Sequence, residues 1–247
     1  MKLALLGYGA MNRIVEARAH EQKHEIAFRL CSRSIVDSTG ETIAPRDAET
    51  IAERLRGVDA AIDFSVASAV LTHTKACMRA NVPLVIGTTG WNADEKVVCD
   101  FVEQHDGALI YGANFSVGVN LFYRIVRRAA ELFNNVEAYA PFIEESHHAR
   151  KKDAPSGTAL KLKDVLGENY FDLNVPITSL RAGYIPGTHV VGFDSHADQI
   201  TLTHTARSRE GFATGALLAA GWIAKRSGVY EFSEALDEIL VERMNGL

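Results

Sequence analysis

The chain has 247 residues, of which 47% are hydrophobic and 23% charged, and its formal net charge is −5 at pH 7. These are the proportions of a soluble globular protein with enough chain for one large domain or two small ones. The charge argues against nucleic acid as a general partner, because no excess of basic residues is present to neutralise phosphates. No apolar run reaches the roughly 18 residues that cross a membrane.

Three cysteines, Cys31, Cys77 and Cys99, are scattered along the chain without the spacing of a metal site. The N-terminal stretch MKLALLGYGAMNR has too short an apolar part, and too much glycine after it, for a signal peptide. The odd number of cysteines fits reduced thiols better than disulfides, so we expect a cytoplasmic protein.

The first 115 residues alternate between short apolar runs and stretches with helical spacing. The apolar runs predict buried strands at KLALLG, EIAFRLC, DAAIDFS, PLVIGTT and ALIYGAN. The helical stretches cover residues 10–22, 47–56, 67–80 and 92–104. Strands and helices that alternate over short connections predict an α/β fold, a doubly wound parallel sheet with helices on both faces.

After Asn114 the pattern becomes a mixture of strands and helices. A strong helical pattern covers 118–133, with an apolar face formed by Leu121, Ile125, Ala129 and Leu132. Further strands are predicted near 137–145, 178–184, 188–194 and 198–205, and further helices at 156–166 and 210–225. We therefore predict an α+β domain with an open mixed sheet over 118–208. Residues 1–117 and 209–247 form the first domain, to which the last helix returns.

Two glycines lie between the first predicted strand and the first predicted helix, in LALLGYGAMNR. Gly7 allows the tight turn, and Gly9 lets a pyrophosphate approach the helix start near Ala10, where free N–H groups and the helix dipole bind anions. Asn12 replaces the third glycine of the dinucleotide-binding pattern, so we expect looser packing of helix against strand and a modest cofactor affinity. The alternative is a glycine turn that binds nothing.

The end of the second predicted strand indicates which dinucleotide is preferred. Ser32 and Arg33 follow this strand, and no carboxylate occurs until Asp37. An acidic side chain here would bind the adenine ribose hydroxyls of NADH, whereas arginine and hydroxyls suit the 2′-phosphate of NADPH. We therefore expect NADPH to be used at least as well as NADH. The alternative is that Arg33 is an ordinary solvated residue.

Three more turns with small or hydroxyl residues, at 62–68, 85–91 and 111–120, follow predicted strands. The carboxyl ends of parallel strands meet at one edge of a sheet, where open α/β sheets bind ligands. Each turn alone could be ordinary turn chemistry, but together they favour a ligand site. With the glycine turn they supply the candidate cofactor-binding residues Gly7, Tyr8, Gly9, Ala10, Met11, Asn12, Phe64, Gly87, Thr88, Thr89, Gly112, Ala113, Asn114 and Phe115.

One stretch, EESHHARKKDAPSGTAL at 144–160, concentrates proton carriers and positive charge. Adjacent histidines such as His147 and His148 are most often surface residues. Here they are followed by Lys151 and by a turn that starts a helix, which favours a functional site.

The rest of this stretch has plainer interpretations. Glu144 and Glu145 would point to opposite faces of a strand, which argues against a shared acid/base pair. The two adjacent histidines lack a third ligand at a suitable spacing, so we predict no metal site. Asp153 and Ser156 are interpreted as helix caps.

The motif HHARKKDAPSGTA, together with GTTG, ANFSVGVN and THTARSREGFATGA, resembles the dihydrodipicolinate reductases, also called 4-hydroxy-tetrahydrodipicolinate reductases. The resemblance runs in order from Gly7 to about Tyr230, nearly the whole chain. It implies a Rossmann-type domain, a substrate domain whose sheet assembles a homotetramer, and NADPH or NADH as cofactor. It also implies reduction of 4-hydroxy-tetrahydrodipicolinate to tetrahydrodipicolinate, a step of diaminopimelate and lysine biosynthesis.

The resemblance carries site residues onto this sequence. His147 takes the place of the family's proton donor and Lys151 that of its catalytic lysine; histidine can supply a proton near neutral pH. A dicarboxylate substrate would be bound by His148 and by the backbone N–H groups of Gly157 and Thr158 at a helix N-terminus. The last motif adds two cofactor-binding candidates, Arg209 and Phe212.

Two other functions are open on the residues alone. One is a binding or sensor protein that keeps the dinucleotide fold without catalysis, against which the intact His147 and Lys151 argue. The other is a different dehydrogenase of similar layout, for example one acting on an amino-acid semialdehyde. That alternative leaves the block of histidines, lysine and DAPSGT unexplained.

Overall fold

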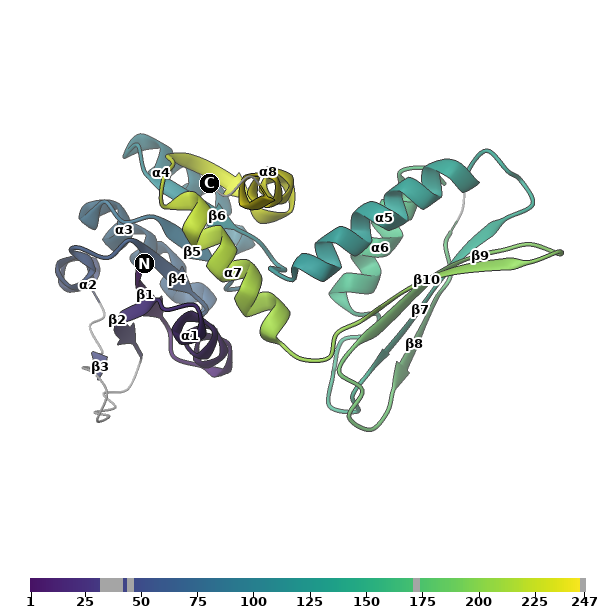
Figure 1. Ribbon diagram of the computed structural model, residues 1–247, viewed down its shortest axis with the longest axis horizontal. Coiled ribbons are helices and arrows are strands. Elements are labelled where there is room, and N and C mark those ends of the chain that lie inside the picture. Colours follow the sequence, from purple (N-terminus) through teal and green to yellow (C-terminus); the bar gives the residue numbers. More distant parts are fainter. Residues whose placement is uncertain (32–41, 44–46, 171–173, 245–247) are drawn as a thin grey trace. The chain divides into compact units, whose positions relative to one another are not determined.

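The computed structural model describes residues 1–31, 42–43, 47–170 and 174–244. The chain divides into two compact units (Figure 1). Unit 1 consists of Met1–Val117 and Arg209–Leu247, and unit 2 consists of Gly118–Ser208. Within the described ranges, none of the helices has both the length and the apolar character that crossing a membrane requires.

The described part of unit 1 holds a parallel sheet of seven strands in the order β11-β6-β5-β4-β1-β2-β3. The strands are β1 (Lys2–Leu6), β2 (Glu25–Leu30), β3 (Thr42–Ile43), β4 (Ala60–Asp63), β5 (Leu84–Ile86), β6 (Ala108–Tyr111) and β11 (Gly228–Glu231). The main helices are α1 (Ala10–Glu21), α2 (Ala48–Leu55), α3 (Val70–Ala80), α4 (Glu95–Gln104), α7 (Glu210–Ile223) and α8 (Phe232–Met244). The predicted doubly wound α/β fold is therefore confirmed.

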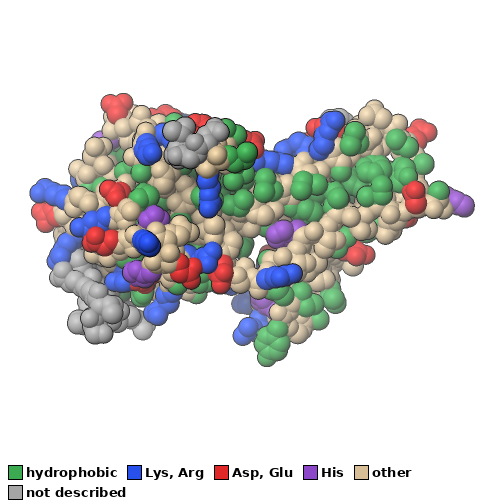
Figure 2. Space-filling model, in the orientation of Figure 1, with side chains coloured by type: hydrophobic (Ala, Val, Ile, Leu, Met, Phe, Trp, Pro, Cys, Tyr) green, Lys and Arg blue, Asp and Glu red, His purple; other side chains and the backbone are tan. Residues whose placement is uncertain are grey.

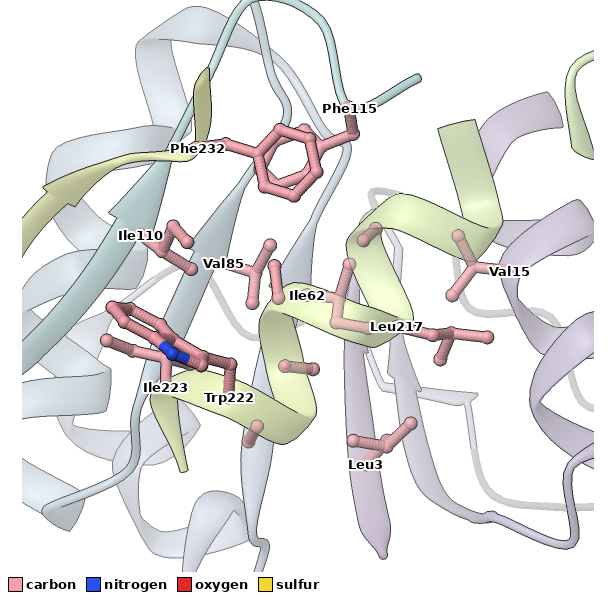
Figure 3. Packing of buried hydrophobic residues seen from close by; sticks show 14 of the residues in the cluster. Leu3, Val15, Ile62, Val85, Ile110, Phe115, Leu217, Trp222, Ile223 and Phe232 are labelled. Carbon is pink, nitrogen blue, oxygen red and sulfur yellow. The ribbon is translucent and has the colours of Figure 1, made fainter. Parts of the chain in front are cut away.

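Two separate hydrophobic cores cover the two faces of this sheet. Side chains alternate along a strand, so Leu3 and Leu5 of β1 join one core while Ala4 and Leu6 join the other. Helices α1, α7 and α8 pack on the first face, where Val15 and other apolar side chains meet α7 (Figure 3). Helices α2, α3 and α4 cover the second face.

The C-terminal part of unit 1 goes beyond the sequence prediction. Helix α7 returns to this unit as expected, but no element was predicted after residue 225. The structure adds β11, which extends the sheet beside β6, and α8, which joins the first core. Strand β11 is only four residues long and half-exposed, so its sequence GVYE lacks the long apolar run that identified the central strands.

The described part of unit 2 is a mixed four-stranded sheet with helices. Its strands are β7 (Ala140–His147), β8 (Ile177–Arg181), β9 (Thr188–Asp194) and β10 (Gln199–Thr205), in the order β10-β9-β7-β8. Strand β7 is parallel to β8 and antiparallel to β9. Helices α5 (Val117–Phe133) and α6 (Gly157–Gly167) contribute to the core of this unit together with β7 and β9. The predicted open mixed sheet is therefore confirmed.

The predicted packing face of α5 was wrong. Ile125 is 55% exposed and Leu132 57% exposed, whereas Phe122 and Val126, each one position along from the predicted Leu121 and Ile125, are buried in the core. Both sets of residues are apolar and four residues apart, so helical spacing alone cannot choose between them. Hydrophobic side chains are accordingly visible on the surface over α5 (Figure 2).

Candidate active site

The turn after β1 has the geometry of a dinucleotide-binding turn. Gly7 has a φ of +83°, and a Cβ at this position would lie 2.7 Å from Cα of Ser65. Gly9 is the N-cap of α1 and has open space where a Cβ would be. None of the described side chains caps α1, whose first residues are Ala10 and Met11. The exposed N–H groups and the helix dipole therefore fit the pyrophosphate of a nicotinamide dinucleotide.

Asn12 tightens this turn, contrary to the expectation that it loosens the packing. Its side chain is fully buried, and its Nδ2 donates hydrogen bonds to the carbonyl of Leu6 at 2.9 Å and of Gly7 at 2.6 Å. The side-chain amide thus links α1 to the end of β1, where the usual glycine would only permit close approach. The missing glycine alone predicted looser packing, whereas the amide donors of asparagine hold the turn.

Tyr8, between the two glycines, is held by charged neighbours. Its hydroxyl donates to Glu16 at 2.5 Å, and Glu16 also forms a buried ion pair with Arg29 of β2. The guanidinium of Arg13 lies 4.7 Å from the centre of the Tyr8 ring. The exposed Arg13 therefore places a positive charge beside the glycine turn, a feature that sequence reasoning missed.

The turns after β4 and β5 are joined by the buried carboxylate of Asp63. This carboxylate accepts hydrogen bonds from the N–H of Ser65 and the hydroxyl of Thr88, each at 2.8 Å, and lies 2.7 Å from Nδ1 of His73 on α3. Thr88 is thus committed to the protein interior, whereas its neighbour Thr89 is exposed. Of the two predicted threonines, Thr89 has the side chain better placed for a cofactor.

The other cofactor-binding residues predicted in the turns after β4, β5 and β6 differ in whether their side chains are free to contact a ligand. A Cβ on Gly87 would lie 2.1 Å from the ring of Phe64, so the glycine makes room for that ring. The side chain of Phe115 belongs to the core, where it stacks on Phe232 with ring centres 4.6 Å apart (Figure 3). Asn114 accepts a hydrogen bond from the N–H of Ser116 at 2.9 Å.

The start of α7 lies beside the turn after β6. A Cβ on Gly215 of α7 would lie 1.8 Å from the carbonyl oxygen of Phe115, and one on Gly211 would lie 3.5 Å from Oγ of Ser116. This contact brings Arg209 and Phe212 to the same part of unit 1 as the predicted Gly112 and Ala113. Ser32 and Arg33 lie outside the described residues.

In unit 2, the register of the sheet gathers the ionisable side chains around the end of β7. Glu145 and His147 are two residues apart on β7 and face the same side. Glu145 stands opposite His189 of β9, and His147 stands opposite Arg181 of β8. All four side chains are buried or half-buried. Glu144 is exposed on the other face, as predicted.

A buried carboxylate supports the predicted proton donor. Glu145 is 1% exposed and its Oε2 contacts Nδ1 of His147, while its Oε1 accepts from Arg181 at 2.5 Å and from the N–H of Ser156 at 3.2 Å. Burial alone would raise the pKa of Glu145, but the hydrogen bonds from Arg181 and Ser179 and the charge of His147 lower it to about 2. Glu145 is therefore ionised at neutral pH.

The charge on His147 is set by opposing effects. Burial lowers its pKa, the carboxylate of Glu145 raises it, and the positive charges of Lys151 and Arg181 lower it, with a net lowering. The imidazole is therefore neutral for most molecules at neutral pH in the substrate-free enzyme. A negative charge placed near the ring would raise this pKa and favour the protonated form that a proton donor requires.

The loop from β7 to α6 carries the other predicted residues. Nζ of Lys151 lies 2.8 Å from the carboxylate of Asp153. Ser156 caps α6 by accepting from the N–H of Ala159 at 3.2 Å, so Ser156 is the cap and Asp153 is not. The backbone N–H groups of Gly157 and Thr158 precede that of Ala159. They lie at the N-terminus of α6, where an anion binds favourably.

Two histidines flank this loop. Nδ1 of His148 is buried and forms no hydrogen bond within the described part of the chain, so it is a polar atom that a substrate carboxylate could satisfy. His189 lies with its Nε2 3.1 Å from Oγ of Ser156 and its ring 5.1 Å from that of His147. Burial, followed by the charge of His147, lowers the pKa of His189 to about 4, so this ring is neutral at neutral pH.

Glu145, His147 and His189 also place potential metal ligands within 4.8 Å of one another. The sequence argument against a metal considered only adjacent histidines and overlooked this grouping. However, the Glu145 carboxylate already contacts Arg181 and His147, and the nearby Lys151 adds further positive charge. We therefore interpret the group as a hydrogen-bonded ion-pair network, and the absence of a metal stays a prediction.

A glycine turn at the edge of an open parallel sheet and a second unit with a charged histidine–lysine site define a two-unit NAD(P)H-dependent oxidoreductase. The family models described as dihydrodipicolinate reductase, N-terminus and C-terminus, match residues 1–115 and 118–236. The chain belongs to the dihydrodipicolinate reductase family.

Individual relatives support this membership. The 4-hydroxy-tetrahydrodipicolinate reductase of Christiangramia forsetii is 36% identical over 250 residues, which cover 97% of this chain and 99% of that protein. The reductase of the same name from Methanosarcina barkeri is 35% identical over 207 residues, 77% of each chain. The structure of dipicolinate-bound dihydrodipicolinate reductase from Paenisporosarcina sp. TG-14 has a TM-score of 0.80 at 22% identity and covers 95% of this chain and 98% of that one, which shows a shared fold.

The predicted family and reaction are thereby confirmed. The protein reduces 4-hydroxy-tetrahydrodipicolinate with a nicotinamide cofactor, in the diaminopimelate and lysine biosynthesis pathway. A dehydrogenase of another family does not account for matches that cover both units.

Proposed function

We propose that His147 supplies the proton for this reduction, that Lys151 assists it, and that His148 with the start of α6 binds the substrate carboxylates. Replacing the ring hydroxyl by hydrogen consumes one hydride and one proton and releases one water molecule. The reduced nicotinamide, when bound, supplies the hydride. The chain must therefore provide the proton, and the observation that carries the proposal is the buried contact between His147 and the ionised Glu145.

Each remaining residue has a role suited to its position. Lys151 can stabilise negative charge that develops on the ring as hydride arrives, or return a proton to His147. The unpartnered Nδ1 of His148 and the N–H groups of Gly157 and Thr158 can bind carboxylates. The dipicolinate named in the Paenisporosarcina structure is a ring dicarboxylate, which supports a small dicarboxylate as substrate here.

Steady-state kinetics of three variants test these roles. His147→Gln and Lys151→Ala should lower turnover by about 100-fold or more, while cofactor binding, followed by fluorescence, stays nearly unchanged. His148→Gln should raise the Michaelis constant for the substrate more than it lowers turnover. Near-normal turnover of His147→Gln would mean that His147 is not the proton donor, leaving Lys151 as the donor in this motif.

We further propose that NADPH serves at least as well as NADH. The support is the basic character near the glycine turn: Arg33 follows the second strand in the sequence, and Arg13 presents an exposed guanidinium over Tyr8. Michaelis constants for both cofactors, measured on the native chain and on Arg33→Ala, test the proposal. A strong preference for NADH that this substitution leaves unchanged would contradict it.

We also infer a cytoplasmic homotetramer. The three cysteines are free thiols, which supports a reducing compartment. In the sheet of unit 2, Leu180 is 51% exposed and Ile200 43% exposed, so strands β8 and β10 present apolar side chains that another subunit could cover. Light scattering that gives a monomer at micromolar concentration would refute the tetramer, and cell fractionation tests the location.

A further inference from the structure

Glu145 is a buried carboxylate in unit 2 that contacts the proposed proton donor, His147. Its two carboxylate oxygens are used differently: Oε1 accepts from the guanidinium of Arg181 at 2.5 Å and from the N–H of Ser156 at 3.2 Å, and Oε2 lies against Nδ1 of His147. Ser179 also hydrogen-bonds to this carboxylate. The carboxylate is therefore fixed on one side, and its other oxygen is aimed at Nδ1 of His147.

This contact selects one tautomer of the neutral imidazole. An ionised carboxylate accepts hydrogen bonds but cannot donate them, so Nδ1 of His147 carries the hydrogen. The other ring nitrogen, Nε2, then exchanges protons with the substrate. The space at Nε2 is left by Gly187, where a Cβ would lie 3.1 Å from this nitrogen.

Arg181 also binds the loop between β7 and α6 that carries Lys151. Besides Glu145, its Nη2 donates to the backbone carbonyl of Asp153 at 2.6 Å, and the carboxylate of Asp153 holds Lys151 at 2.8 Å. The residue that follows β8 also binds this region, since the N–H of Ala182 donates to the carbonyl of His147 at 2.9 Å. One guanidinium therefore connects the support of His147 with the backbone that carries Lys151.

We propose that Glu145 and Arg181 are positioning residues for proton transfer: the carboxylate fixes His147 with its Nε2 toward the substrate, and Arg181 holds that carboxylate and the Lys151 loop in register. Neither residue touches the reacting atoms. The proposal rests on the role proposed for His147. It adds that Glu145 and Arg181 set the orientation and the tautomer of the His147 ring.

The substitution Glu145→Gln separates the tautomer effect from a loss of packing. The amide oxygen of glutamine can still accept from Arg181, but its NH₂ group would donate to Nδ1 and move the hydrogen of the neutral ring to Nε2. We expect turnover to fall by roughly 100-fold or more with the Michaelis constants for substrate and cofactor within about threefold of normal. Glu145→Asp, which keeps the charge, should recover most of that loss.

Glu168→Gln is a matched control in the same unit. Glu168 also pairs with an arginine, accepting from Nε of Arg127 at 2.8 Å and from Nη2 at 3.1 Å, but this pair is exposed on the surface. The control removes the same charge from the same kind of pair and should leave turnover within about twofold of normal. Equal losses in Glu145→Gln and Glu168→Gln would overturn the proposal.

The ¹⁵N resonances of the His147 ring give a second test, and its native measurement does not depend on whether a variant folds. In the native enzyme we expect the neutral ring to carry its hydrogen on Nδ1, and in Glu145→Gln on Nε2. A native ring with its hydrogen on Nε2 would overturn the proposal. So would normal turnover of Glu145→Gln when His147→Gln has lost activity. Normal turnover of His147→Gln would instead contradict the proton-donor role itself.

Discussion

Asp63 in unit 1 and Glu145 in unit 2 are both almost completely buried carboxylates that contact Nδ1 of a buried histidine. The remaining contacts of the two carboxylates differ. Those of Asp63 go to Ser65 and Thr88, in the turns that follow β4 and β5. Those of Glu145 go to an arginine and to the cap of α6, beside a loop that carries a lysine.

The difference teaches that an acid–histidine pair is not by itself a proton-transfer site. In unit 1 the pair ties together two backbone turns at the edge of the sheet where we expect the cofactor to bind. In unit 2 the arginine neutralises part of the carboxylate charge and the nearby lysine acts on the histidine, so the pKa of His147 is tuned by its neighbours. We expect the surrounding charges and the group that faces the second ring nitrogen to decide whether such a pair transfers protons.

The largest expected effect of breaking the unit 1 pair is on stability. Asp63→Asn leaves His73 and the N–H of Ser65 with a poorer partner, which should lower the free energy of unfolding by about 3 kcal/mol. The Michaelis constant for the cofactor should rise because the two turns loosen. Denaturant unfolding and cofactor titration measure both quantities. Asp100→Asn is the control: this residue pairs with Lys96 on the surface, and its loss should cost less than about 0.5 kcal/mol.

His189 makes the unit 2 network sensitive to acid. Because its pKa falls to about 4 in the folded protein, below the 6.5 of the free side chain, the unfolded state binds more protons between these values. Stability is therefore lost as the pH falls from about 6.5 to 4, by roughly 3 kcal/mol. In His189→Gln this loss should shrink, while the loss below pH 4.5 that comes from Glu145 should remain. An unchanged profile in urea unfolding between pH 6.5 and 4 would contradict the account.

A smaller change in turnover is expected when the space beside Nε2 of His147 is filled. Gly187 has a φ of +142° and Gly183 a φ of +47°, but only at Gly187 would a Cβ approach the imidazole, at 3.1 Å from Nε2. Both alanine substitutions strain the backbone. We expect Gly187→Ala to lower turnover about tenfold, a barrier increase of roughly 1.4 kcal/mol, and Gly183→Ala to change it less than twofold. Similar turnover in the two variants would show that Nε2 does not face the substrate.

Local patterns in the sequence predicted the parts of the molecule that depend on neighbouring residues. The apolar strands, the glycine turn and the cap at Ser156 are of this kind. The pairing of Glu145 with His147 was also readable, since residues two apart in a strand share a face, but the sequence argument compared Glu145 only with Glu144. Arg181 and His189 could not be found in this way, because 36 residues separate Arg181 from Glu145 and the register of β7 with β8 and β9 brings them together.

The most direct test of the central claim is turnover at saturating substrate and cofactor, measured side by side for Asp63→Asn and Glu145→Gln. Each substitution turns the carboxylic acid of a buried acid–histidine pair into its amide, so the two variants differ chiefly in which pair is altered. We expect Glu145→Gln to lose roughly 100-fold or more and Asp63→Asn to stay within about threefold of the native enzyme. Equal losses in the two folded variants, or a larger loss in Asp63→Asn, would contradict the assignment of proton transfer to unit 2.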